Sequence, residues 1–495
     1  MIGLLALIVA VGLAGGGYIY WFLSGDGIRL AIEQQATAWL GRPVRIESAS
    51  ARFFPRVGIT LRNVRVGEPA TLTLATVAVS TDMRALLDRR IEQAEITVSD
   101  SRIQMPLPSI ATKTSAQSVG ASAIRLVSVR TIALNDVTLI SRGREIVVSA
   151  ESSLAGDQLT LRRFSARTAQ TALEAEGIVA LAPRIDATIR AKANLLDVDE
   201  LIALADAFTP DAGTGRSAGP SPRIAARISA ERARAGGVDV AQFATEMSVD
   251  GNRVTLSPLT FQIFGGRYQG SLTARLGDTL QASLRSRITG LDVARLAEFG
   301  GVSGAITGTL SGAGDFSGRG ADMAAALASA RGEGTATVEK GTIQRLDLIR
   351  TVVLFFGRPA PETAAATDGF ERMDMTFSLA NQVFSATAFS LQSRDADIVG
   401  SGTLDVDAKA LAGRLDLSLS EELSAQAGTD LQRYTLEGGR IVLPATLGGT
   451  LGQPRLRIDA RAAVTRGLKN EVQRRLGGLL DRFRTREPAT GPPQP

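Results

Sequence analysis

Alternation of apolar and polar residues, repeated in short segments over most of this 495-residue chain, is the feature that most restricts its fold. Val57, Ile59 and Leu61 follow the pattern, and Val64 and Val66 resume it one residue out of phase. A period of two places the apolar side chains on one face of a β-strand, and a β-bulge would allow the phase change. The same alternation occurs at 187–195, 373–379, 415–419 and 456–458. The sequence therefore predicts a mainly β protein whose strands each have one apolar face.

The alternation alone leaves the use of the apolar face open. In any antiparallel β protein, such as a sandwich or a barrel, this face is simply the core. A sheet whose apolar face stays accessible would give the same pattern. Periodicity does not distinguish the two arrangements.

Helices are expected at only a few places. Residues 28–40 carry an apolar stripe that stops at Gly41, with Pro43 just beyond, which is typical of a helix end. Three short helices each begin with an aspartate that can cap the helix, at 82–87, 197–201 and 292–296. Their recurrence predicts a repeated unit of several strands and one short helix.

The composition excludes most kinds of active site. The chain has no cysteine and no histidine, so it lacks thiolate nucleophiles, thiolate metal sites, a Ser-His-Asp triad and the commonest general base. Gly312–Gly318 lacks the lysine of a phosphate-binding loop and is interpreted as a hairpin turn. Asp405 and Asp407 flank one residue of a predicted strand and are expected on a solvated face. We therefore expect no enzyme, no cofactor and no metal site.

Nucleic acid is not an expected partner. The 55 basic and 50 acidic side chains nearly balance, and aromatic residues make up only 5% of the chain. Proteins that bind single strands need aromatic stacking platforms along a basic groove.

The segment from Ile2 to Leu23 is uncharged and long enough to cross a membrane as a helix. A cleaved signal peptide would need a basic start, a shorter apolar run and small residues at its exit, whereas this run ends in Tyr20, Trp21, Phe22 and Leu23. We therefore expect a retained single-pass anchor. Its predicted apolar residues are Ile2, Leu4, Leu5, Leu7, Ile8, Val9, Val11, Leu13, Ile19, Trp21, Phe22 and Leu23.

Near the C-terminus, the pattern predicts an amphipathic helix with one apolar and one basic face. It either caps the last strand edge or touches an anionic membrane surface. The candidate membrane-facing residues are Arg466, Lys469, Arg474, Arg475 and Arg482.

Composition shifts divide the chain into predicted regions. Segments 106–121, 209–222 and 359–369 are rich in Ser, Thr, Ala, Gly and Pro and are expected to be surface loops. The expected regions are an anchor at 1–27, an N-terminal β region with a juxtamembrane helix at 28–108, a middle β repeat at 109–222, a C-terminal β region at 223–462, the basic helix at 463–486 and a disordered tail at 487–495.

Several segments together resemble one known family. Near the N-terminus these are Gly41–Val44, Phe54–Ile59 and Leu61–Gly67, followed by 81–88 and 96–103. In the C-terminal half they are Gly332–Leu348 and Leu443–Leu451, the latter followed by Gln453 and Pro454. In this combination the chain resembles the AsmA-like proteins, although it has no basic residue before its apolar run.

The resemblance implies a location and a use for the apolar face. AsmA-like proteins are anchored in the inner membrane of Gram-negative bacteria, with their bulk in the periplasm. The implied fold is an elongated, curled antiparallel β-groove whose apolar face holds the acyl chains of phospholipids. The residues that would line the groove are Leu61, Val64, Ile189, Met375, Phe377, Leu417, Leu419 and Ile458.

The function expected from these observations is passive conduction of phospholipid along the groove for outer-membrane biogenesis and envelope integrity. The alternative is a periplasmic scaffold that assists the assembly of outer-membrane proteins or their targeting to the membrane, with a strand edge as its contact. Its partners would be outer-membrane assembly proteins or other inner-membrane proteins. An envelope glycan hydrolase is a distant third, because such an enzyme needs two carboxylates in a pocket.

Overall fold

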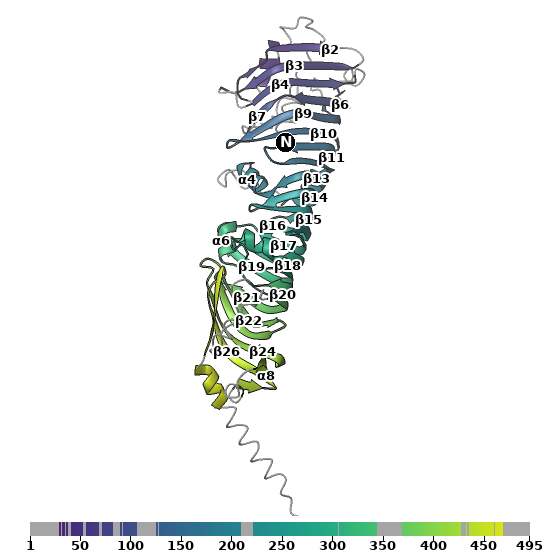
Figure 1. Cartoon of the computed structure of the whole chain (residues 1–495). Coiled ribbons are helices and arrows are strands. Elements are labelled where there is room, and N and C mark those ends of the chain that lie inside the picture. The colour runs from purple at the N-terminus through teal and green to yellow at the C-terminus, as the bar shows by residue number, and fades with distance from the viewer. Residues whose placement is uncertain are drawn as a thin grey trace, which may run out of the picture. The chain divides into compact units, whose positions relative to one another are not determined.

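A computed structural model describes residues 29–30, 32–34, 36–37, 41–52, 56–68, 72–82, 90–91, 93–105, 125–126, 128–208, 221–304, 306–343, 369–426, 432, 435–459 and 461–468. The fold is mainly β, with 25 strands in one large mixed sheet and a few short helices (Figure 1). The chain divides into two compact units, Met1–Phe261 (unit 1) and Gln262–Pro495 (unit 2). This division falls inside the region 223–462 that composition alone treats as one.

Unit 1 contains most of the shorter strands and one labelled helix. Its elements are β1 (Val44–Arg45), β2 (Ser48–Arg52), β3 (Val57–Val66), β4 (Leu72–Thr81), β5 (Arg90–Ile91), β6 (Ala94–Ser99), β7 (Arg102–Gln104), β8 (Arg125–Leu126), β9 (Val129–Ser141), β10 (Arg144–Ala155), β11 (Gln158–Arg167), β12 (Ala172–Ala180), β13 (Asp186–Asp197), α4 (Val198–Phe208), β14 (Arg223–Ala235), β15 (Val238–Asp250) and most of β16 (Arg253–Ile263).

Unit 2 continues with long strands and the short helices α5, α6 and α8. Its elements are β17 (Gly266–Arg275), β18 (Leu280–Asp292), α5 (Val293–Phe299), β19 (Thr309–Gly320), α6 (Met323–Ala328), β20 (Arg331–Thr342), β21 (Gly369–Ala380), β22 (Val383–Gln392), β23 (Ala396–Asp405), β24 (Leu411–Leu419), α8 (Glu421–Gln426), β25 (Leu436–Glu437), β26 (Arg440–Thr450) and β27 (Gln453–Ile458).

The predicted alternation is confirmed in β3, but the bulge is not. Val57, Ile59 and Leu61 are buried, and so are Val64 and Val66 after the phase change. The pairing of β3 with β4 keeps one register throughout. The phase changes at Asn63, whose φ of +49° turns the strand about its axis without an inserted residue.

The sheet is mixed, so the prediction of an antiparallel sheet is wrong at particular strand pairs. β13 and β14 are parallel, as are β6 and β9, and β7 and β9. Parallel neighbours need a crossover connection rather than a tight turn, and the chain between β13 and β14 includes α4. The pairs recorded from β17 to β24, and from β24 through β26 to β27, are antiparallel.

Several helix predictions are confirmed. The described residues within 29–37 are helical, and the chain turns away at Gly41, whose φ is +66° and whose N–H donates to Thr37 O at 2.9 Å. Asp292 caps α5, and Asp197 accepts from the N–H of Glu200 at 2.8 Å at the start of α4. Residues 83–87 of the other predicted short helix lie outside the described residues.

Two local predictions fail. Gly312–Gly318 is not a hairpin turn, because it lies inside β19 and pairs with β18 and β20. Asp407 does not share a strand face with Asp405, since β23 ends at Asp405 and Asp407 follows in an exposed turn.

Each unit has a closed hydrophobic core at a limited part of its sheet. In unit 1 the strands β1–β9 bury Ile32, Leu61, Val64, Ile96 and Val98, among others. In unit 2 the core gathers residues from β20–β27 and α5. The candidate site of each unit lies on the apolar sheet face next to its core.

Candidate functional site: an apolar sheet face

Strands β12–β15 of unit 1 form an almost unbroken apolar face. Their registers place side chains of equal height in rows that run across the strands. Most members are Ala, Gly or β-branched residues, so the face is shallow. The rows are Leu173, Ala193, Ala230 and Phe243; Ala175, Ala191, Ile228 and Thr245; Gly177, Ile189, Ala226 and Met247; and Val179, Ala187, Ile224 and Val249.

The opposite face of the same strands is charged and internally paired. Arg190 donates to Glu176 at 2.7 Å, and Arg227 donates to Glu246 at 2.6 Å. These side chains are more than half exposed, so each pair contributes little stability. The charged pairs favour exposure of this face to water. Because side chains alternate between the two faces, this places the apolar rows on the other face.

A furrow of about 690 Å³ crosses this charged face of unit 1. Glu176, Arg190 and Arg227 wall one side, and Ile178 and Thr188 wall the other. Because neighbouring residues of a strand point to opposite faces, the row between them, which includes Ile189, contributes backbone to its floor. The furrow is therefore separate from the apolar face.

Helix α4 covers one end of the apolar face in unit 1. Its Val198 and Leu201 pack with Ala193, Leu196 and Ala233. The helix is tied down where Glu200 accepts from Thr168 Oγ1 at 2.5 Å. This covering is local, and half-buried rows such as Gly177 to Met247 lie beyond it.

Unit 2 builds its apolar face from large side chains set against glycines. Gly334 pairs with Phe377 and Gly332 pairs with Leu379. A Cβ on Gly334 would lie 2.7 Å from Phe377 Cζ, and one on Gly332 would lie 2.5 Å from Phe316 Cδ1. The phenyl rings thus occupy the space that neighbouring side chains would fill, and the glycines are required by these close approaches.

The phenylalanines of this face also contact one another. The ring centroids of Phe316 and Phe377 are 6.4 Å apart, and those of Phe377 and Phe384 are 5.5 Å apart in an edge-on arrangement. Both separations fall in the range of favourable aromatic pairs. The rings form a continuous aromatic floor across β19, β21 and β22.

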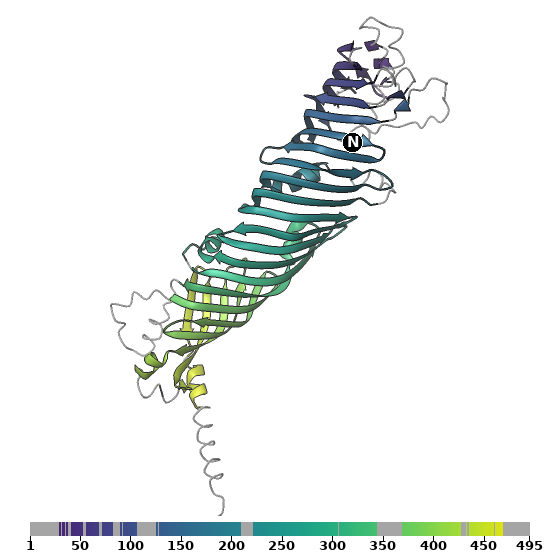
Figure 2. The same cartoon turned by 90° about the vertical axis from the view of Figure 1, so that its right-hand side faces the viewer.

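An apolar cavity of about 440 Å³ lies over Phe377 and Phe384 of this floor in unit 2. Figure 2 shows the yellow strands of residues 440–458 behind the green strands, and the cavity lining draws on both groups. Its walls are almost wholly aliphatic or aromatic, which suits hydrocarbon. Lining residues include Met373, Met375, Phe377, Phe384, Phe389, Leu404, Leu411, Leu415, Leu447, Leu451 and Leu456.

The cavity ends against a fully buried core. Ile398, Leu417, Ile441 and Leu443 have exposed fractions of 2%, 1%, 0% and 0%. These side chains fill the sheet interior beside α8, so the cavity has a closed end there. Along strands β22–β26, side chains that line the cavity are therefore followed within one or two residues by side chains of the core.

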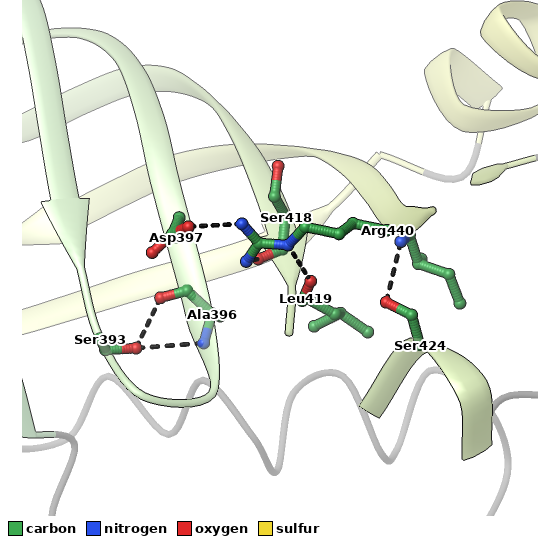
Figure 3. A network of polar contacts seen from close by, with 8 residues as sticks. Ser393, Ala396, Asp397, Ser418, Leu419, Ser424 and Arg440 are labelled. Carbon is green, nitrogen blue, oxygen red and sulfur yellow. Dashed lines mark hydrogen bonds and ion pairs between the residues drawn. The ribbon is translucent and has the colours of Figure 1, made fainter. Parts of the chain in front are cut away.

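Arg440 fastens this closed end (Figure 3). Its guanidinium contacts Asp397 Oδ2 at 2.6 Å and donates to the carbonyls of Leu419 and Ser418 at 2.6 and 3.1 Å. Nearby, the Ile441 N–H donates to Ser424 Oγ of α8 at 2.9 Å. The arginine thus joins β23, β24 and β26 beside the core.

The predicted groove residues fall into different environments. Leu61 and Val64, at 1% and 2% exposure, belong to the closed core of unit 1. Leu417 and Leu419, at 1% and 3%, belong to that of unit 2. A ligand cannot reach these four without displacing the core.

The other predicted groove residues lie on accessible surface. Met375 and Phe377 line the unit 2 cavity. Ile458 is half-buried beside the unit 2 core, and Ile189 is half-buried on the apolar face of unit 1. Sequence alternation identified the apolar face of each strand but could not separate core from accessible surface. The glycines opposite the rings, Gly332 and Gly334, are the sequence signal for the cavity that alternation does not contain.

Arg466 is engaged within the protein. It lies in a helical segment at 461–468 and contacts Asp416 at 2.9 Å and Glu437 at 2.7 Å. Its predicted membrane contact gains no support from these ion pairs. Lys469, Arg474, Arg475 and Arg482 lie outside the described residues, as do the anchor residues from Ile2 to Leu23.

The described part of the chain contains no cluster of three or more acidic, cysteine or histidine side chains that could hold a metal ion. Among the helices described, none combines the length and the apolar character needed to cross a membrane.

The chain matches no model of a known protein family, and no curated protein matches it. A search of solved structures gives the crystal structure of Pseudomonas aeruginosa OccK8 (OprE), with 8% identity and a TM-score of 0.14 over 81% of this chain and 89% of that chain. A similarity this weak carries no argument about fold or function.

Proposed function

We propose that this protein shelters the acyl chains of phospholipids on its apolar sheet face and conducts them between membranes of a Gram-negative cell envelope. The observation that carries the proposal is the unit 2 cavity, whose walls are almost wholly apolar and which lies on the face predicted from alternation. Its volume of about 440 Å³ is in the range of small-molecule sites. Each buried methylene would gain about 0.8 kcal/mol.

We propose no residue for catalysis. The chain offers no histidine or cysteine, and Glu176 and Glu246 on the charged face of unit 1 are paired with arginines. We therefore propose a passive carrier without cofactor. The resemblance to AsmA-like proteins supports a retained inner-membrane anchor, with the β units in the periplasm.

A photo-crosslinking experiment in cells tests this function. A photoreactive residue at Phe377 or Met375 should capture phospholipid, because both line the cavity. The same residue at Thr376, an exposed neighbour on the other face, is the matched control. Lipid adducts that are equal at both positions, or absent from the cavity position, would contradict the proposal. Protein adducts at the cavity position would instead favour the scaffold alternative.

A further inference from the structure

Three segments far apart in sequence meet at one edge of the unit 2 cavity. They are the segment 300–302 that follows α5, the turn between β23 and β24, and the turn between β26 and β27. Lys409 Nζ, from the first turn, donates to the Gly300 carbonyl at 2.8 Å. That carbonyl follows the last residue of α5, where a cation is favoured.

The two turns are also joined directly to each other. The Leu451 N–H donates to Lys409 O at 2.9 Å, and Ala410 forms a bridge with Thr450. Behind them Val302 is only 8% exposed, and a Cβ on Gly452 would lie 3.4 Å from Val302 Cγ1. The two joined turns therefore pack against Val302 through Gly452.

Each of the three segments runs directly into the cavity wall. Ile306 follows the α5 segment, Leu404 and Leu411 flank the first turn, and Leu451 and Pro454 belong to or follow the second. Separating the turns from α5 would therefore open the cavity along this line of contact, which we call the seam.

The seam differs from the rest of the cavity wall in how it is held. The strands β21–β24 are joined along their lengths by antiparallel ladders of backbone hydrogen bonds, with one register shift each between β21 and β22 and between β22 and β23. Across the seam the contacts above amount to one lysine hydrogen bond, from an exposed side chain, and apolar contact at Val302. Because exposed charged contacts are weak, this part of the wall opens most easily.

We propose that the seam is the port through which acyl chains reach the unit 2 cavity, with Lys409 as its latch. This proposal rests on the proposed lipid-binding function. When the Lys409 hydrogen bond is released, the turns of β23–β24 and β26–β27 swing away from α5 while the core at Leu417 and Leu443 stays packed.

A disulfide across the seam provides the test, since the chain has no cysteine of its own. In the full chain, Val302→Cys and Gly452→Cys would be combined, and uptake of pyrene-labelled phosphatidylglycerol would be followed from vesicles of phosphatidylethanolamine and phosphatidylglycerol. Oxidation should slow uptake about tenfold or more, and reduction should restore it. Each single cysteine variant controls for the substitutions, and circular dichroism reports whether the variants fold.

The latch itself is tested by Lys409→Met. Uptake should become several-fold faster, while the amount of lipid bound at equilibrium stays the same, because the cavity is unchanged. Lys340→Met is the matched control, since both lysines are exposed and have φ of +52°.

The outcomes separate the port from the function on which it rests. Lipid bound equally fast by the oxidised and reduced forms would overturn the port and leave lipid binding intact. No lipid bound by the reduced form or by the unsubstituted chain would overturn the proposed function itself. A slower Lys409→Met variant would show that the lysine supports the wall and is not a latch.

Discussion

Units 1 and 2 make apolar sheet faces from opposite materials. In unit 1 the rows across β12–β15 consist largely of alanines, such as Ala191 and Ala226, and β-branched residues, and the face is shallow. In unit 2 glycines stand opposite Phe316 and Phe377, and the sheet encloses a cavity. Rows made mostly of small and β-branched residues leave a shallow surface, whereas large residues opposite glycines give depth while the backbones stay close. The same period of two therefore produces a surface in one unit and a pocket in the other.

The largest expected effect distinguishes cavity wall from core within unit 2. Leu443→Ala removes a side chain with 0% exposure and should cost about 2–5 kcal/mol of unfolding free energy. Leu447→Ala, four residues along β26, removes a half-buried side chain beside existing space and should cost clearly less. Denaturant unfolding followed by circular dichroism measures both losses. Equal losses would mean that the cavity is ordinary core.

The aromatic floor is tested by adding a methyl group beneath it. Gly334→Ala places a Cβ 2.5 Å from Ala313 O and 2.7 Å from Phe377 Cζ, so the ring must rise into the cavity. We expect a loss of about 1–3 kcal/mol of stability and less bound lipid. Gly448→Ala in β26 meets nothing within 4 Å and should change neither quantity. Lipid extraction and thermal unfolding measure the two effects.

Unit 1 offers a test in the opposite direction. Thr245 lies on its apolar face, and its Oγ1 is the buried side-chain polar atom without a hydrogen-bond partner among the described residues. Thr245→Val should therefore raise the unfolding free energy, by about 1 kcal/mol. Thr260→Val removes a hydroxyl that donates to Ala244 O at 3.2 Å and should lower it. A destabilised Thr245→Val variant would mean that the hydroxyl has a partner in solution.

The smallest effect concerns the charged face of unit 2. Hydrogen bonds from Arg372 and Thr337 lower the pKa of the Asp374 carboxyl below its ordinary 3.8. The ionised form therefore stabilises the fold above pH 3.8, and this contribution is lost as the pH falls through the folded pKa. Asp374→Asn should flatten the acid side of the stability curve slightly, because the pair is exposed. Asp278→Asn, at an exposed turn, should leave the curve unchanged.

Local pattern was enough for much of the fold. The alternation at Leu415, Leu417 and Leu419 predicted side chains that are buried on one face of β24. The aspartate caps of α4 and α5 and the glycine end at Gly41 were also readable, since these signals act within a few residues. The same signal at Asp322, whose side chain accepts from Ala325 N, could have identified α6.

The rest depended on contacts between distant residues. Gly312–Gly318 has the composition of a turn, yet it is a strand, and its glycines lie close to the backbone of β20 and α6 and to the ring of Phe316. Leu61 and Phe377 follow the same alternation, but one lies in a core and the other lines a cavity. Whether a strand face is covered depends on what folds over it, and a single strand does not carry that information.

The glycine-backed rings have a consequence for movement along the floor. Rings that lie against backbone leave few steps between one strand and the next, so the surface has low corrugation. Dispersion contacts with such a surface are individually small and nearly alike, so a hydrocarbon that shifts by one methylene exchanges each contact for an equivalent one. We expect such a chain to slide readily while staying dry, and the floor then retains hydrocarbon without fixing its position.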